Sequence, residues 1–338
     1  MDNNLKTIVI DAMGGDHGPK VTVQAAINAT KNKDVIIILV GDLEKINFEL
    51  NKYSEKEKQL IKVFPAEGVV SEGEHPALAF KSKPKASIFV AAGIVKSGKA
   101  DGFISMGSTG ASIAAATVLF GTHDGVDRGA LGGPIVGFAP KSIIIDLGTN
   151  VDTKPNQLVD FAALGNIMAK KIYEVDNPRI AILSVGSEEG KGNNLVKDTS
   201  KLLSNTDLNF TGNIEPNEIP FSKADVILCD GFVGNVVLKL TEGLGDAVVE
   251  LIKKELGDNN QSKDLQNSIF EKMNTLAAFG GGPLLGVNGL AIVGHGSSNA
   301  IGITNAVETA KFVIKTNLIE AQKEELTKIR KQINRKKN

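Results

Sequence analysis

The sequence has almost no cysteine, no tryptophan and no excess of charge of either sign. One Cys among 338 residues excludes a disulfide framework and a cysteine-based metal cluster. The 38 Lys and Arg residues nearly balance the 39 Asp and Glu residues, so no global field favours nucleic acid or a membrane surface. With 42% hydrophobic and 23% charged residues, the composition is that of a folded globular protein. What the chain has in excess is glycine, with 36 residues.

Secretory and membrane-spanning segments are not expected either. The polar N-terminus leads directly into a predicted strand, so we expect no signal peptide. The uncharged stretches 102–122 and 273–294 are broken by Gly, Ser, Thr or Pro, so neither is typical of one continuous apolar helix. We therefore expect a cytoplasmic protein.

Short apolar, β-branched runs alternate with helical patterns along the chain. The predicted strands are 7–10, 35–40, 102–105, 143–145, 180–185, 226–228 and 290–293. The predicted helices are 19–31, 84–97, 109–120, 155–173, 194–204, 234–256 and a C-terminal helix capped by Ser297 with an apolar stripe through Leu318. This alternation predicts an α/β protein with a mostly parallel sheet.

No Pro- or Ser-rich linker and no repeat of fixed period divides the chain. We therefore expect a single catalytic α/β domain over 1–327, with a helical subdomain at 232–280. Residues 328–338 are rich in Lys and Arg and are expected to form a basic, solvated C-terminal tail that frays.

The glycines gather after the predicted strands. They are Gly14, Gly15, Gly107, Gly110, Gly148, Gly186, Gly190, Gly192, Gly231, Gly234, Gly294 and Gly296. In an open parallel sheet, ligands bind at the carboxyl ends of the strands, and glycine lets backbone N–H groups come close to an anion. Ordinary β-to-α turns are the alternative for any single loop. The whole set, interleaved with polar residues, favours a site for phosphate or another small anion.

Standard nucleophile, nucleotide and metal motifs are missing. The segment Gly186-Ser-Glu-Glu-Gly-Lys-Gly192 is one residue short of a phosphate-binding P-loop, and Gly192 stands where Ser or Thr would bind Mg²⁺. No dinucleotide fingerprint and no full nucleophile elbow is present. The four His residues lack metal-ligand spacing, and Asp11, Asp16 and His17 are interpreted as polar turn residues rather than cation ligands.

These absences leave an anion site without an evident protein nucleophile. Cys229, in an apolar run, is interpreted as a buried small hydrophobic residue. We therefore expect neither a metal nor a cofactor, and phosphate itself becomes the candidate nucleophile.

A series of motifs over nearly the whole chain resembles the phosphate acyltransferase (PlsX) family. The N-terminal one is Asp11-Ala-Met-Gly-Gly-Asp-His-Gly-Pro19. The others are Ser105–Ala111, Asp146–Asp152, Gly186–Asn193, Asp230–Lys239, Gly282–Gly289 and His295–Asn299. Several long motifs in the same order are far more specific than any one of them.

The resemblance implies a fold, an activity and partners. The family fold is a three-layer αβα sandwich similar to those of phosphotransacetylases and isopropylmalate dehydrogenases, usually in a homodimer. Its members move a long-chain fatty acyl group from acyl carrier protein to inorganic phosphate, which gives acyl phosphate for phospholipid synthesis. Peripheral association with the inner face of the plasma membrane is a further expectation. Nucleic acid is not an expected partner.

The resemblance also carries site residues over to this chain. Lys191 and Asn235 match the family's catalytic pair. The phosphate-binding residues are expected to be Gly14, Gly15, Asp16, His17, Ser108, Thr109, Gly110, His295, Gly296, Ser297, Ser298 and Asn299. The alternatives are a solvated loop lysine for Lys191 and a helix-start cap for Asn235.

The acyl carrier protein is acidic, so a basic docking patch is expected. Lys81, Lys83 and Lys85 are the candidates for it, with a merely solvated face as the alternative.

The sequence departs from the family pattern at two places. Ser108 replaces the usual Asn, and the stretch 257–279 is shorter and less basic, with only a thin apolar stripe.

Three other functions remain open from the sequence. A phosphotransacetylase-like enzyme would use acyl-CoA in place of the carrier protein. A nicotinamide dehydrogenase of the related fold would need a dinucleotide and a metal. A non-catalytic scaffold at the membrane would bind lipid without turnover.

Overall fold

The chain forms two compact units in a computed structural model, which describes residues 5–71, 73–257, 259–278 and 280–335. Unit 1 comprises residues 1–123 and 277–319, and unit 2 comprises 124–276 and 320–338. The chain thus leaves unit 1, builds most of unit 2, returns to complete unit 1 and ends in unit 2. A single catalytic domain over 1–327 stays a prediction.

Unit 1 is built on a mostly parallel sheet. Its strands are β1 (Lys6–Asp11), β2 (Val35–Gly41), β3 (Ile61–Pro65), β4 (Gly102–Ser105), β10 (Gly282–Leu285) and β11 (Leu290–Val293). Their order is β3-β2-β1-β4-β11-β10, and β10 alone among these paired strands runs antiparallel to its neighbour β11. The central strands β1, β4 and β11 therefore end at the same edge.

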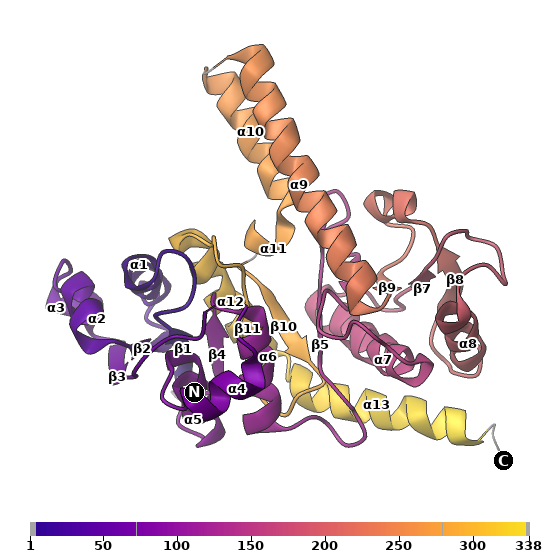
Figure 1. Cartoon of the computed structure of the whole chain (residues 1–338), viewed down its shortest axis with the longest axis horizontal. Coiled ribbons are helices and arrows are strands. Elements are labelled where there is room, and N and C mark those ends of the chain that lie inside the picture. The colour runs from indigo at the N-terminus through magenta and orange to yellow at the C-terminus, as the bar shows by residue number, and fades with distance from the viewer. Residues whose placement is uncertain (1–4, 72, 258, 279, 336–338) are drawn as a thin grey trace. The chain divides into compact units, whose positions relative to one another are not determined.

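Helices cover both faces of this sheet (Figure 1). They are α1 (Pro19–Ala29), α2 (Leu43–Leu50), α3 (Glu55–Lys58), α4 (Pro76–Ser82), α5 (Ser87–Lys96), α6 (Thr109–Phe120) and α12 (Ala300–Lys315). Val9 and Phe103 pack into the core shared with α5 and α6, whereas Ile8 and Ile10 point to the other face and are equally buried. The uninterrupted apolar runs of the sequence follow from this double coverage.

Unit 2 is also built on a sheet with helices packed against it, and this sheet has fewer strands. Its strands are β5 (Ala130–Gly133), β6 (Ile143–Ile145), β7 (Ile180–Leu183), β8 (Phe210–Ile214) and β9 (Val226–Leu228), in the order β5-β6-β9-β7-β8. Its helices are α7 (Pro155–Ile172), α8 (Asn194–Leu203), α9 (Gly231–Leu256) and α10 (Asn260–Met273), with a 3₁₀ turn at Pro216–Phe221. In both units the αβα architecture agrees with the predicted fold class.

The long helix α9 and its partner α10 lie side by side as a hairpin (Figure 1). They occupy the segment where the sequence predicts a helical subdomain, and α11 (Thr275–Ala278) follows them. Among the described residues, no helix is both long enough and apolar enough to cross a membrane.

The C-terminal helical stripe is divided into two helices. Asn317 has a φ of 52°, which ends α12 and lets α13 (Leu318–Arg335) begin in a new direction. Residues 328–335 of the predicted basic tail belong to α13, and residues 336–338 lie outside the described residues. Arg330 donates to Asp160 of α7 at 2.9 and 2.7 Å, so this part of the tail is held by an ion pair.

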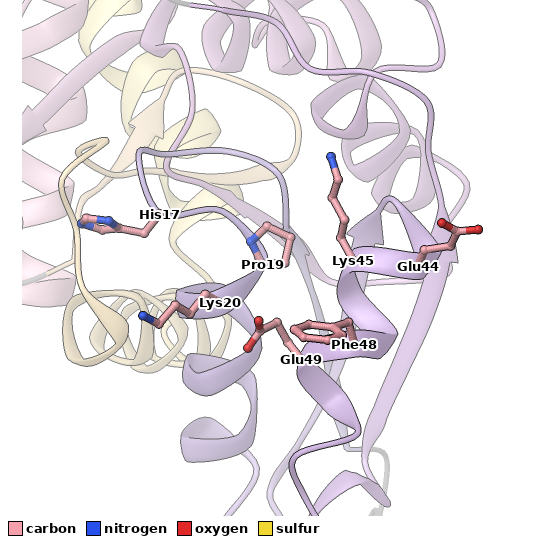
Figure 2. Close-up of a pocket in the computed structure, with 7 residues that line it drawn as sticks. All are labelled: His17, Pro19, Lys20, Glu44, Lys45, Phe48 and Glu49. Atoms are coloured by element: carbon pink, nitrogen blue, oxygen red, sulfur yellow. The ribbon is translucent and has the colours of Figure 1, made fainter.

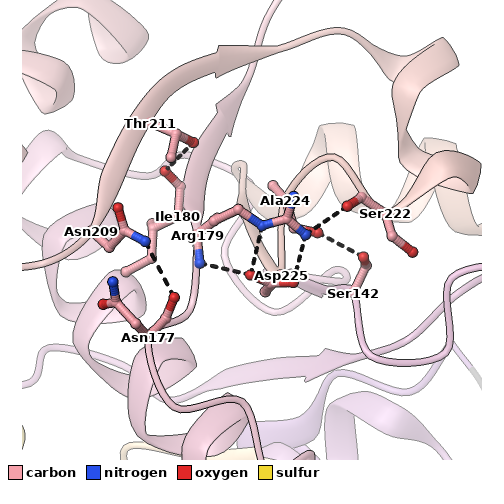
Figure 3. Close-up of polar contacts among 9 residues, drawn as sticks. All are labelled: Ser142, Asn177, Arg179, Ile180, Asn209, Thr211, Ser222, Ala224 and Asp225. Atoms are coloured by element: carbon pink, nitrogen blue, oxygen red, sulfur yellow. Dashed lines mark hydrogen bonds and ion pairs between the residues drawn. The ribbon is translucent and has the colours of Figure 1, made fainter.

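A polar cluster lies at the amino ends of strands β7 and β9 in unit 2 (Figure 3). Arg179, before β7, donates from Nε and Nη2 to the carboxylate of Asp225, before β9, at 3.0 and 2.9 Å. Its backbone N–H donates to the same carboxylate at 2.8 Å. Burial acts to raise the pKa of Asp225, but the hydrogen bonds from Arg179 outweigh it and hold the pKa below its ordinary value.

We expect Asp225→Asn to destabilise the protein by about 2 kcal/mol at neutral pH, as for a charge-assisted hydrogen-bonded pair. Because the folded-state pKa of Asp225 is lowered, the pair stabilises above the unfolded pKa of about 3.9 and loses its effect as pH falls through the folded value. Urea unfolding at neutral and acidic pH measures this. The control is Asp198→Asn, which removes the exposed pair with Lys201. Equal losses in the two variants, or a loss that persists in acid, would contradict the prediction.

Candidate active site

Three loops of unit 1 come together at the carboxyl edge of its sheet. They follow β1, β4 and β11, which are neighbours in that sheet. The N–H of Asp16 donates to the carbonyl of Gly296 at 2.9 Å. A Cβ atom on Gly14 would lie 2.8 Å from the amide nitrogen of Gly107, so those two backbones touch. All the residues predicted to bind phosphate therefore lie in one loop cluster, made of residues 14–17, 107–110 and 294–299.

Each loop of the cluster leads into the N-terminus of a helix, namely α1, α6 or α12. The positive ends of three helix dipoles, with the N–H groups of their first turns, form a natural environment for an anion. Ser108 caps α6 by accepting from the N–H of Ala111 at 3.4 Å.

The prediction that Ser297 caps the last of these helices is wrong. Asn299 is the N-cap of α12, and its Oδ1 accepts from the N–H of Gly302 at 3.0 Å. A tight turn, in which the N–H of Ser298 donates to the carbonyl of His295 at 3.0 Å, delays the start of the helix. The Ser297 hydroxyl instead lies 2.8 Å from Nδ1 of His295.

A buried carboxylate supports the cluster from below. Asp11 is 2% exposed, and its Oδ2 accepts from the Ser105 hydroxyl at 2.8 Å. Its Oδ1 accepts from the N–H of Met13 at 3.3 Å, and the Ser105 hydroxyl in turn accepts from the N–H of Gly107 at 3.1 Å. Burial raises the pKa of Asp11 despite these hydrogen bonds. This network was not predicted from the sequence, although Asp11 directly follows one predicted strand, Ser105 ends another, and both lie inside the motifs quoted above.

One polar group in the cluster lacks a partner. The Ser298 hydroxyl is buried, with the residue only 5% exposed, and it makes no hydrogen bond with any described residue. A buried hydroxyl normally finds a partner, so this one is ready to bond to a ligand.

His17 also lines a hollow between α1 and α2 beside the cluster (Figure 2). The hollow has a volume of about 450 Å³ and an exposed Phe48 in its wall. Lys20 and Lys45 are matched there by two carboxylates, Glu44 and Glu49, so the hollow adds no net positive charge to the cluster.

Lys191 lies in the loop that follows β7 in unit 2. The carbonyls of Glu188 and Lys191 accept from the side-chain amide of Asn213 at 3.1 and 3.4 Å, which holds the loop against β8. The Lys191 side chain is exposed, and its ammonium group forms no ion pair with any described residue. The structure thus leaves this charge available for a ligand.

Asn235 lies one turn into α9, the helix that follows β9. Asp230 is the N-cap, since its carboxylate accepts from the N–H of Val233 at 2.7 Å, and the interpretation of Asn235 as a helix-start cap is therefore wrong. The Asn235 side chain lies against Gly148, where an added Cβ atom would be 3.4 Å from the Cβ of Asn235. Because β7 and β9 are neighbours, Lys191 and Asn235 stand at the same edge of the unit 2 sheet.

The loop beneath Asn235 is organised by Asp146. Its buried carboxylate accepts from the N–H groups of Thr149 and Asn150 at 3.1 and 2.6 Å, and from the Asn150 side chain at 2.8 Å. A Cβ atom on Gly234 would lie 1.8 Å from the carbonyl oxygen of Asp146, so only glycine lets α9 approach this closely. The loop and the first turns of α9 therefore form one rigid support for Asn235.

The three candidate docking lysines have different surroundings. Lys83 pairs with Glu74 at 2.7 Å, and Lys85 pairs with Glu67 at 3.1 Å. Lys81 is exposed and, within the described parts of the chain, forms no ion pair. Among the described residues, Lys81 is therefore the one lysine of the three whose charge is not paired.

The described residues contain neither a reactive thiol nor a group of side chains suited to a metal ion. Cys229 is 4% exposed, and burial strongly raises the pKa of its thiol, which makes it a poor nucleophile, as predicted. Within the described ranges, no three His, Cys, Asp or Glu side chains are gathered so that they could hold a metal ion.

Known proteins are similar to this chain over nearly its whole length. Residues 6–321 match the family model described as "Fatty acid synthesis protein". A phosphate acyltransferase of Desulfitobacterium hafniense is 42% identical over 326 residues, which cover 94% of this chain and 97% of that protein. One from Clostridium novyi is 40% identical over 320 residues, with coverage of 93% and 96%. A phosphotransacetylase of Streptococcus pyogenes has a similar fold, with a TM-score of 0.60 at 18% identity over 92% of this chain and 95% of that one.

Proposed function

Because the chain belongs to the fatty acid synthesis protein family, in which its curated relatives are phosphate acyltransferases, we propose that it transfers a fatty acyl group from acyl carrier protein to inorganic phosphate. The observation that carries this proposal is the cluster of three helix N-termini at one edge of the unit 1 sheet, with an unpartnered Ser298 hydroxyl. Such a cluster suits a small oxyanion, and the described residues offer no reactive thiol to accept the acyl group.

The reaction needs no protein nucleophile. An unprotonated oxygen of phosphate attacks the carbonyl carbon of the thioester, a carbon–oxygen bond forms and the carbon–sulfur bond breaks. The carrier leaves as a thiol, and the proton that it gains balances the one lost by the hydrogen phosphate. A thioester is already activated, so the protein's work is to position the reactants and to stabilise the negative charge that develops on the carbonyl oxygen.

We assign the roles as follows. The loop cluster of unit 1 holds phosphate through backbone N–H groups and the Thr109 and Ser298 hydroxyls. Lys191 neutralises phosphate or the developing oxyanion, which its unpaired ammonium group supports. Asn235 donates its amide N–H to the thioester carbonyl, and its support by Gly148 and Asp146 limits the motion of that amide.

The test is to mix the purified protein with a long-chain acyl carrier protein and phosphate and to measure acyl phosphate. The same acyl group on CoA is assayed in parallel, because a phosphotransacetylase-like enzyme would prefer that donor. Phosphate-dependent acyl phosphate from the carrier substrate supports the proposal. Turnover with acyl-CoA alone would show that the acyl donor is CoA and not the carrier protein. Lipid binding without turnover would support a non-catalytic scaffold.

The basic segment at Lys81, Lys83 and Lys85 is our proposed docking site for the acidic carrier. Charge reversal at all three positions is expected to raise KM for the acyl carrier substrate several-fold and to leave KM for phosphate unchanged. Because Lys83 and Lys85 are already paired with carboxylates, Lys81→Glu alone is expected to give most of the effect.

Steady-state kinetics at low and moderate salt measure this change, since an exposed charge contact weakens as ionic strength rises. Lys99→Glu is the matched control, an exposed lysine of unit 1 outside this segment. A carrier KM that is equal in Lys81→Glu and Lys99→Glu would reject the docking site.

We also propose a cytoplasmic homodimer with peripheral attachment to the inner face of the plasma membrane. A row of exposed apolar side chains along α9 supports contact with an apolar surface. It is formed by Val236, Leu240, Leu244, Val248 and Leu251. From the sequence, an apolar stripe was expected in 257–279, whereas the exposed row lies in α9.

A further inference from the structure

Asp16 places a carboxylate at the edge of the loop cluster. The residue is exposed, and its N–H donates to the carbonyl of Gly296 at 2.9 Å. Its Oδ1 lies 3.1 Å from the position that a Cβ atom on Gly296 would take, so the carboxylate lies over the backbone of the 294–299 loop. Among the residues that the structure describes, it accepts no hydrogen bond and forms no ion pair.

Asp11, the carboxylate that supports the loop cluster, differs from Asp16 both in its exposure and in its hydrogen bonds. It is buried, and it accepts hydrogen bonds from Ser105 and from the backbone of Met13. Asp11 is therefore committed to holding the loops together. Asp16 keeps its lone pairs free for a ligand that can donate a hydrogen bond.

The negative charge of Asp16 affects which anions the loop cluster can bind. It repels any bound anion, and only an anion that carries a hydrogen can offset this repulsion by donating a hydrogen bond to it. Inorganic phosphate near neutral pH keeps at least one P–OH group. Sulfate, which has the same tetrahedral shape, has none. A carboxylate at this position therefore favours phosphate and opposes sulfate.

We propose that Asp16 is a specificity-determining residue that accepts a hydrogen bond from the protonated oxygen of phosphate and thereby excludes sulfate. This inference rests on the proposed function, in which the loop cluster holds phosphate. The hydrogen bond also orients the substrate, because the oxygen held at Asp16 is protonated and the attack must come from an unprotonated one. A site built to bond a substrate hydrogen discriminates strongly against an analogue that lacks it.

The test compares the wild-type protein with Asp16→Asn in acyl phosphate formation, with sulfate as inhibitor. Asparagine keeps the size of the side chain but removes the charge. Wild type is expected to be poorly inhibited by sulfate. In Asp16→Asn the inhibition constant for sulfate should fall by roughly ten- to a hundredfold, and KM for phosphate should rise. The matched control is Glu44→Gln, which removes a nearby exposed carboxylate from the hollow beside His17 and should leave both constants unchanged.

The outcomes separate this inference from the function on which it rests. Wild type that forms acyl phosphate but is inhibited by sulfate near its KM for phosphate would overturn the role of Asp16. So would an Asp16→Asn variant with the wild-type ratio of the two constants, or an equal change in Glu44→Gln. Absence of acyl phosphate from the wild-type reaction would instead remove the proposed function. Circular dichroism and a thermal melt confirm that each variant is folded.

Discussion

Lys191→Ala is expected to lower kcat/KM for acyl phosphate formation by roughly 10²–10³-fold, the loss measured when one charge-stabilising group is removed from such a site. This corresponds to about 3–4 kcal/mol of transition-state stabilisation. The expectation follows from the surroundings of the side chain. The loop backbone is held by Asn213, whereas the ammonium group is exposed and forms no ion pair with the described residues. Its removal therefore takes charge from the site and little from the fold.

Stopped assays of acyl phosphate, together with a thermal melt, measure both consequences. Lys197→Ala is the matched control, because Lys197 is an exposed lysine on the first turns of α8, directly after the same loop. Its activity should stay within a few-fold of wild type. Near-wild-type activity of Lys191→Ala, or an equal loss in Lys197→Ala, would contradict the assigned role.

Gly234→Ala is expected to have the second large effect, on both stability and activity. The added methyl group would lie 1.8 Å from the carbonyl oxygen of Asp146, and that carbonyl belongs to a loop held by its own carboxylate. Neither side can yield easily, so the start of α9 must move, and Asn235 moves with it. We expect a destabilisation of about 2–4 kcal/mol and a fall in kcat of at least tenfold.

The same helix offers a matched control at Gly243. There an added Cβ atom meets nothing within 4 Å, so Gly243→Ala should stabilise the helix by up to about 1 kcal/mol and leave kcat unchanged. Urea unfolding and steady-state kinetics compare the two variants. Equal stability and activity in the two would show that close approach of α9 to the Asp146 loop does not matter.

The edge of the sheet where the candidate site lies could be predicted from the sequence. Apolar β-branched runs marked the central strands, and the glycines marked the loops at their carboxyl ends. The order of the strands could not be predicted. β1 and β4 pair although about 90 residues separate them, and β11 becomes the neighbour of β4 only because the chain returns from unit 2 to complete unit 1.

Other elements escaped prediction for local reasons. β5 and β10 contain Gly or Pro and carry little strand propensity of their own, so their strands depend on the partners that the fold supplies. The break between α12 and α13 depends on the left-handed backbone conformation of Asn317. It was not predicted because the apolar stripe continues through Leu318 without interruption. The cap at Asn299 required knowledge of the turn that precedes it.

The ion-pair partners of the lysines could not be predicted from the sequence either. Three lysines in five residues favour a basic patch, but Glu74 and Glu67 neutralise Lys83 and Lys85 in the folded chain. In unit 2, the N-cap of α9 is Asp230, whereas the sequence also allowed Asn235 as a cap. Both findings concern side-chain partners, which local patterns do not identify.

The central claim is that phosphate itself attacks the acyl carbon, and phosphate labelled with heavy oxygen tests it most directly. The purified protein is incubated with a long-chain acyl carrier protein and fully labelled phosphate, and the acyl phosphate is analysed by mass spectrometry. Direct attack predicts a product that retains every labelled oxygen of the phosphate, formed in step with release of the carrier thiol. Release of free fatty acid in place of acyl phosphate, or a product that has lost one labelled oxygen, would contradict the mechanism.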